Sequence, residues 1–297
     1  MKRLVKLIYE NVCCPDPCYQ PKWEPIADSA FFVDGVRPNN NTRFRWDYAS
    51  HLAFPDSGEF FFARTDGKGK GPTPLLAGLK GIPHINYHEF GLVSEIAAGS
   101  GSVAIGVPYR SLDAQPLGGS AAGFSDMTVT TKSLLFDSEL FMTSLQFRTY
   151  IPTGNFSKGL GVGHVSLEPG LLFGLRLSTE TYLQAEVLEW IPIAGDPDYA
   201  GAHLQYGLSV NHILWRPVKD VQLIGTLEFD GYSFQDGLYT DSVLGPQKLS
   251  GQNTLSIGNG YRIFYCDKFD VGAAGNFGIV GKFIARAEMR FEMRFRY

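Results

Sequence analysis

The chain has 297 residues, enough for one large β domain or two domains of average size. Its net charge of −4 gives no basic field of the kind that binds nucleic acid, so no nucleic-acid partner is expected. No stretch approaches the roughly 18 apolar residues of a membrane helix, which excludes a helical membrane protein. A barrel that crosses with strands remains open, because alternating apolar and polar residues average to a neutral hydropathy.

The N-terminal part is rich in proline and cysteine and shows no strand pattern. We expect residues 1–29 to form an irregular periplasmic segment or a plug, and residues 30–297 to form the main domain. Cys13, Cys14 and Cys18 lie in the run CCPDPC, which lacks a second ligand pair downstream and so predicts no metal site. A local disulfide or a lipid attachment is the alternative. The apolar part of the N-terminus is short and interrupted by charges, so no signal peptide is evident.

Period-two alternation of apolar and polar residues runs from about residue 43 to the C-terminus, and helical periodicity is nearly absent. The pattern predicts strands at 43–54, 58–64, 86–97, 102–111, 126–136, 141–151, 164–177, 181–191, 201–214, 221–234, 254–265, 269–280 and 283–297. Most of those after residue 86 reach the about 9–11 residues that a tilted strand needs to cross a bilayer. Soluble sandwiches rarely need strands of this length. The sequence therefore predicts an all-β, closed, antiparallel transmembrane barrel.

The last strand separates its two faces most clearly. One face carries Ala287, Met289, Phe291, Met293, Phe295 and Tyr297, and the other carries Arg286, Glu288, Arg290, Glu292, Arg294 and Arg296. A strand that runs to the last residue and ends in Phe-Arg-Tyr resembles the C-terminal signal of outer-membrane barrels. We expect Phe291, Phe295 and Tyr297 to form this signal, with the barrel-insertion machinery and outer-membrane lipid as partners. The expected location is the bacterial outer membrane.

The number of strands follows from the connectors. Short links alternate with long ones, which is typical of barrels with short periplasmic turns and long external loops. The long links are 65–85, 112–125, 152–163, 192–200 and 235–253. Thirteen predicted strands conflict with the even numbers of bacterial single-chain barrels. Either residues 43–64 contribute one spanning strand, for about twelve in all, or Ala30–Asp34 adds a strand to make fourteen; we expect twelve.

Charged residues on the polar faces of the strands are the functional candidates, because they would project into one lumen. The candidate pore-lining residues are Arg148, Glu168, Arg176, Glu228, Asp230, Arg262, Arg286, Glu288, Arg290 and Glu292. Such charges either set the selectivity of a pore or form an ion-pair ladder that braces the barrel. The sequence leaves both interpretations open.

The sequence contains no motif that indicates a catalytic, metal or cofactor site. The run GKGKGP at 67–72 lacks the Ser or Thr of a phosphate loop, and His84 and His88 do not form an HExxH motif. His212 lies on the apolar face of its strand, where a lipid-modifying enzyme could place a base, but no partner serine has a defined position. We therefore predict no enzyme, no metal and no cofactor.

Three segments carry a resemblance to a known family: GFSDMTVTTKSLLF at 123–136, FRTYIPTGN at 147–155 and VSLEPGLLFGLRL at 165–177. They resemble the outer-membrane barrel family named for the MetA pathway of phenol degradation, in particular its transporter-like members from Planctomycetes. The shared residues are Gly123, Asp126, Lys132 and Pro152-Thr153-Gly154. The resemblance covers roughly residues 43–297 and implies a barrel that passes small, often aromatic or hydrophobic compounds. It supplies no catalytic residues.

Besides a lipid-modifying membrane enzyme that would use His212, two functions follow as hypotheses. The first is a channel or transporter for passive passage of small molecules through a polar lumen. The second is a structural or adhesive surface barrel whose lumen is blocked. Permeation of ions across a planar bilayer would separate the two, because a blocked barrel gives no conductance.

Overall fold

The computed structural model describes residues 19–20, 22–53, 78, 80–82, 84–113, 119–281 and 285–297. The strands are β1 (Asn41–Ala53), β2 (His84–Ala98), β3 (Gly101–Asp113), β4 (Ser120–Phe124), β5 (Met127–Asp137), β6 (Phe141–Ile151), β7 (Val165–Arg176), β8 (Thr181–Ile193), β9 (His203–Val218), β10 (Val221–Phe234), β11 (Leu238–Asp241), β12 (Gly245–Lys248), β13 (Asn253–Tyr265), β14 (Phe269–Val280) and β15 (Ala287–Arg296). Two short 3-10 helices, η1 (Pro25–Asp28) and η2 (Phe156–Lys158), complete the secondary structure of this part of the chain. No helix among these residues is long and apolar enough to span a membrane.

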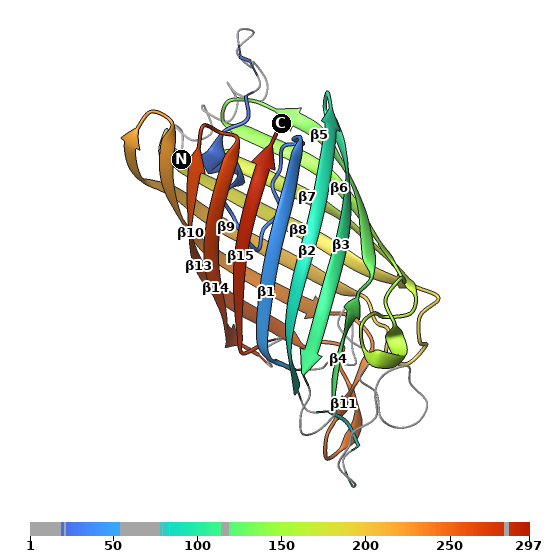
Figure 1. Ribbon diagram of the computed structural model, residues 1–297. Coiled ribbons are helices and arrows are strands. Elements are labelled where there is room, and N and C mark those ends of the chain that lie inside the picture. Colours follow the sequence, from blue (N-terminus) through green and yellow to red (C-terminus); the bar gives the residue numbers. More distant parts are fainter. Residues whose placement is uncertain are drawn as a thin grey trace, which may run out of the picture.

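The strands form a closed antiparallel barrel in which neighbours in sequence are neighbours in space (Figure 1). Strand β1 pairs with β15 over ten residue pairs, from Asn41 opposite Arg296 to Ser50 opposite Ala287, and this pairing closes the ring. Strands β4 and β5 pair with the two halves of β3 and share one place in the ring. The barrel therefore has twelve strands and one extra strand, as the first alternative predicts.

The fourteen-strand alternative is wrong. Residues 30–34 form bends rather than a strand, and their backbone N–H groups are bound by side chains of the barrel wall instead of by a neighbouring strand. The strand predicted at 58–64 lies outside the described residues. Strand β1 ends at Ala53, within the predicted strand 43–54.

The outer wall is apolar around the barrel, and the inner wall is polar. Exposed apolar side chains on successive strands include Leu92, Ile105, Leu145, Leu171, Val187, Leu208, Leu227, Ile263, Phe277 and Met289. The residues that alternate with them are buried and polar, among them Glu95, Lys132, Gln146, Glu168, Glu186, Ser209, Glu228, Arg262, Asp270 and Glu292. A soluble sandwich would bury the first set and expose the second. This inverted arrangement is the one that a barrel surrounded by lipid requires.

The connectors differ between the two ends of the barrel. The links at 138–140, 219–220 and 266–268 are short and lie at the end where the C-terminus emerges (Figure 1). Longer segments, including residues 235–252 with the β11–β12 hairpin, extend from the opposite end. The alternation of short and long links predicted from the sequence is thus present in the fold. Exposed aromatic side chains gather near the short-turn end, namely Trp215, Tyr261, Tyr265, Phe295 and Tyr297, as expected at a membrane interface.

Contact of the outer wall with lipid can be tested at Leu227. This side chain lies midway along β10 and is 41% exposed. Leu227→Arg is expected to destabilise the barrel in phospholipid vesicles by about 2–4 kcal/mol, the cost of a cation near the bilayer midplane. Val243, 73% exposed in the turn between β11 and β12, is the matched control, because arginine there stays in water. Equal unfolding free energies for the two variants, measured by urea titration, would show that Leu227 does not face lipid.

Candidate functional site

The described N-terminal residues from 22 to 40 lie inside the barrel, and we call them the plug. The chain enters at the end where the C-terminus emerges, crosses the lumen and turns back to start β1 (Figure 1). Trp23 packs near Phe264 of β13 at one wall, and Asp34 pairs with Arg148 of β6 at another. The plug continues past residue 29, where the sequence analysis places the domain boundary, and reaches Asn40.

Glu228 of β10 anchors the middle of the plug. Its carboxylate accepts the backbone N–H groups of Phe31 and Phe32 at 2.8 Å each and that of Val33 at 3.2 Å. The Glu228 side chain is fully buried, so these charge-assisted hydrogen bonds replace its lost hydration. Three consecutive N–H groups aimed at one carboxylate fix the path of the plug across the lumen.

Arg262 of β13 anchors the plug from a second wall. Its guanidinium is fully buried and pairs with Asp270 and Glu292, each at 2.6 Å. The same group donates to the carbonyl oxygen of Ser29 at 3.2 Å and lies over the ring of Phe31, 4.1 Å from its centroid. Arg262 thus joins two wall carboxylates to the plug through its planar set of donors.

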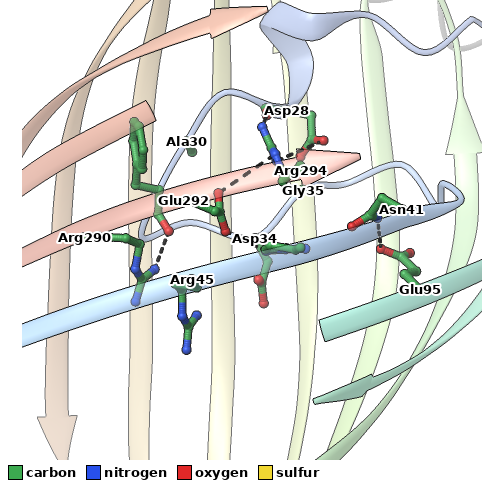
Figure 2. A network of polar contacts seen from close by, with 12 residues as sticks. Asp28, Ala30, Asp34, Gly35, Asn41, Arg45, Glu95, Arg290, Glu292 and Arg294 are labelled. Carbon is green, nitrogen blue, oxygen red and sulfur yellow. Dashed lines mark hydrogen bonds and ion pairs between the residues drawn. The ribbon is translucent and has the colours of Figure 1, made fainter. Parts of the chain in front are cut away.

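Strand β15 contacts the plug through Arg290 and Arg294, both labelled in Figure 2. Arg294 donates to the carbonyl oxygen of Asp28 at 2.6 Å and pairs with the Asp28 carboxylate at 3.2 Å. Arg290 pairs with Asp47 of β1 at 2.7 Å and donates to the carbonyl oxygen of Phe31. The charged face of the last strand therefore holds the plug as well as lining the lumen.

The far side of the plug is held by β5 and β6. Arg148 pairs with Asp34 and, at 2.6 Å, with Glu168 of β7. Lys132 donates to the carbonyl oxygen of Gly35 at 2.5 Å. Burial by itself raises the pKa of Asp34, but Arg148 and Lys132 outweigh it and hold that pKa well below its usual 3.8. Asp34 is therefore ionised throughout the physiological range.

An apolar contact joins the plug to the wall near the short-turn end. Ile26, Ala27 and Val36 of the plug pack into a buried cluster with inward-facing residues of six strands, namely Met142, Leu172, Tyr182, Leu188, Ile213, Ile224 and Phe264. Glycines on the wall make room for the plug. A Cβ atom at Gly260 or Gly272 would lie 2.6 Å from the ring of Phe31. The plug is thus fitted to this wall in shape as well as in charge.

A cavity of about 310 Å³ lies against the plug and extends along the inner wall. Phe31, Phe32 and Asp34 of the plug form part of its lining. The cations in its lining come from β1, β3, β5, β6 and β15, and these are Arg43, Arg45, Arg110, Lys132, Arg148 and Arg290. The carboxylates of Asp47, Glu89 and Glu95 lie among them on β1 and β2. Two further carboxylates, Glu186 and Asp230, come from β8 and β10, which lie opposite β1 and β3 in the strand order.

The structure places the ten predicted pore-lining residues in four settings. Arg148, Asp230, Glu288 and Arg290 line the cavity. Glu168, Glu228, Arg262 and Glu292 face the lumen and are buried by the plug and its ion pairs. Arg176 pairs with Glu24 of the plug at 2.5 Å. Arg286 precedes β15, so the alternation of that strand does not orient it, and its side chain is exposed.

Several site residues escaped the sequence analysis. Glu186 and Asp270 lie on inward faces, and the period-two pattern could have identified both. Asp28 and Asp34 belong to a segment without periodicity, and no local signal marks them. Only their contacts with Arg294 and Arg148 reveal their role.

The remaining sequence motifs, namely the glycine-lysine run, the cysteines and the histidines, form no site in the described residues. Residues 67–72 and the three N-terminal cysteines lie outside the described residues. His84 stacks on His51, with ring centroids 4.3 Å apart. His212 is exposed on the outer wall, and its Nδ1 lies 2.9 Å from the hydroxyl of Thr181. Within the described ranges no three His, Cys, Asp or Glu side chains are grouped closely enough to hold a metal ion.

Solved structures with the same architecture are outer-membrane proteins. An outer-membrane channel from Pseudomonas putida F1 aligns with 90% of this chain and 99% of its own, at 12% identity and a TM-score of 0.56. The chain has the fold of an outer-membrane β-barrel. Two porins are more distant. The NanC porin is 7% identical, and the alignment covers 87% of this chain and 98% of that porin with a TM-score of 0.46. The KdgM porin is 8% identical, and the alignment covers 86% of this chain and 99% of that porin with a TM-score of 0.42. No family model and no curated protein sequence matches the chain.

Proposed function

We propose that this protein is a bacterial outer-membrane channel for passive passage of small molecules, and that the plug closes it. The observation that carries the proposal is the charged cavity of about 310 Å³ beside the plug. A barrel that only braces the membrane gains nothing from an open space lined with charges, because such groups are stabilised by pairing or by water. Lipid around the wall, and insertion directed by Phe291, Phe295 and Tyr297, belong to the same proposal.

We also propose membership of the family named for the MetA pathway of phenol degradation. In support, two of the segments that carry the resemblance are joined by hydrogen bonds. Asp126 accepts the backbone N–H of Gly154 at 2.9 Å and that of Val162 at 2.8 Å, and Thr153 donates to the carbonyl oxygen of Ser125 at 3.0 Å. Lys132 contacts the plug. Aromatic side chains in the cavity, such as Trp190, are consistent with aromatic permeants.

A structural or adhesive barrel is the second candidate, and the many contacts that hold the plug in the lumen favour it. The two proposals differ in whether the plug can leave. Glu228→Gln removes the charge that accepts three N–H groups while preserving the shape of the side chain. In planar bilayers this variant is expected to open roughly ten times more often than the wild type, because each hydrogen bond to a charged group contributes about 1.5–3 kcal/mol.

Glu189→Gln is the matched control for that experiment. Glu189 lies on β8 outside the lumen and contacts Gln235, so its neutralisation should leave the conductance unchanged. If Glu228→Gln and its wild-type parent are equally silent while both migrate as folded barrels on heat-modifiable gels, the channel proposal fails and the blocked barrel is preferred. Recovery of the protein in the soluble cell fraction would contradict both.

The pH dependence of plug docking follows from Asp34. Its pKa is lower in the docked plug than in a free chain, so ionised Asp34 stabilises docking at every pH above about 4. This contribution is lost only as the pH falls through the lower, docked pKa. Arg148, Lys132 and Glu186 surround the group from three strands. The difference in open probability between wild type and Asp34→Asn should stay constant from about pH 8 to about pH 5 and disappear in stronger acid. A difference that vanishes near neutral pH would contradict this assignment.

A further inference from the structure

We propose that the acidic side of the cavity binds the ammonium group of a small organic amine. The site consists of Glu186, Asp230 and Glu288, with Trp190 and Asn276 beside them on the cavity wall. This inference rests on the proposed function, because it concerns the chemistry of the permeant.

The strand register brings two of the carboxylates together. Glu186 of β8 and Asp230 of β10 both lie directly opposite Gly207 of β9. A Cβ atom at Gly207 would lie 2.8 Å from Cγ2 of Val33 in the plug, 3.2 Å from Oδ1 of Asp230 and 3.3 Å from Cγ of Glu186. Both acidic side chains therefore lie beside the same glycine, next to the plug.

These carboxylates form no ion pair. Within the described part of the chain no Lys, Arg or His side chain lies within ion-pair distance of Glu186, Asp230 or Glu288, and Asp230 accepts no hydrogen bond that the geometry supports. The cations that act on them from nearby, Arg148 and Arg290, are already paired with Asp34 and, at 2.7 Å, with Asp47. Adjacent carboxylates repel one another when ionised, and a bound cation removes that cost.

Two buried oxygen atoms in this acidic part of the cavity have no hydrogen-bond partner, which indicates a site for a ligand. Asp230 is 9% exposed and Asn276 is 4% exposed, and the oxygen atoms Oδ2 of Asp230 and Oδ1 of Asn276 have no hydrogen-bond partner. Both are acceptors, as an ammonium group with three N–H donors requires. Buried polar atoms normally have partners, so these two are vacant positions for a donor.

The surroundings favour an organic cation over a bare metal ion. No set of three metal-ligating side chains is close enough to hold a metal among the described residues. Trp190 and Tyr232 line the same cavity, and aromatic faces attract ammonium groups through cation–π interaction. The cavity volume of about 310 Å³ is at the small end for ligand pockets, which suits a small amine.

Titration calorimetry on the full chain in detergent, with 1,4-diaminobutane as the probe, tests the inference. Wild-type protein should bind the diamine, and Asp230→Asn and Glu186→Gln should each weaken binding about ten-fold or more. Glu288→Gln provides a third variant should either of the others fold poorly, as judged by heat-modifiable migration. Glu189→Gln, on the outer face of the same strand as Glu186, should bind as the wild type does.

Uncharged 1-butanol separates recognition of charge from filling of the cavity. Equal affinity for the alcohol and the diamine, or undiminished diamine binding by Asp230→Asn, would overturn the inference. Either result leaves the channel proposal standing as long as Glu228→Gln conducts. Conversely, diamine binding by a barrel that never conducts would retain the site and refute the channel.

Discussion

Replacing residues 26–36 with a glycine–serine linker of equal length is expected to convert a barrel that opens rarely into one that conducts in steady steps. The linker keeps the chain connected to β1 but lacks every side chain that seals the lumen. Ile26, Ala27 and Val36 leave the apolar cluster, and Asp28 and Asp34 no longer meet their arginines. Flexible Gly-Ser segments gain no compensating contacts. Conductance of single molecules in planar bilayers is the measurement.

The same variant should also lose stability. Burial of Ile26 alone is worth about 2–5 kcal/mol relative to a small side chain. The inward-facing leucines and isoleucines that it covers would meet water. A linker variant that stays silent, yet migrates as a folded barrel, would mean that elements other than residues 26–36 close the lumen. A variant that conducts with unchanged unfolding would mean that the plug is not packed as described.

Arg262→Met is expected to cost about 3 kcal/mol of unfolding free energy, because a buried guanidinium loses its charge-assisted contacts. Arg262 is fully buried and lies 2.6 Å from both Asp270 and Glu292. Without it, Asp270 keeps Arg294 and Arg296 as partners, whereas Glu292 keeps the longer contacts with Arg43 at 3.5 Å and Arg294 at 3.9 Å. Urea unfolding in detergent micelles, followed by tryptophan fluorescence, measures the change.

Neutralising Glu292 as well should restore part of the loss. The double variant Arg262→Met, Glu292→Gln removes the carboxylate that depends most on Arg262, and it leaves Asp270 with Arg294 and Arg296, so it should be more stable than Arg262→Met alone. Arg216→Met is the surface control, since Arg216 is exposed near the end of β9 and should change stability by no more than about 0.5 kcal/mol. A double variant less stable than the single one would show that the ion pair with Glu292 is not the source of the effect.

The twelve-stranded barrel could be predicted because its signal is local. Each strand repeats the same contrast between an apolar and a polar face, and strand length and connector length are readable without knowing any partner. The break between β4 and β5 was not predictable in this way. It depends on Asp126, whose carboxylate turns toward Gly154 and Val162 in a distant loop.

The sequence by itself determined that each strand has an apolar face and a charged face, and that the charged faces enclose a lumen. Only the tertiary structure decided that the plug lies in the lumen and that Glu186 and Asp230 both lie beside Gly207. The physical reason is that the plug has no periodicity and is held by partners far along the chain. The carboxylate of Glu228 reaches the N–H of Phe31 across 197 positions of sequence. Such a contact exists only after the ring has closed around it.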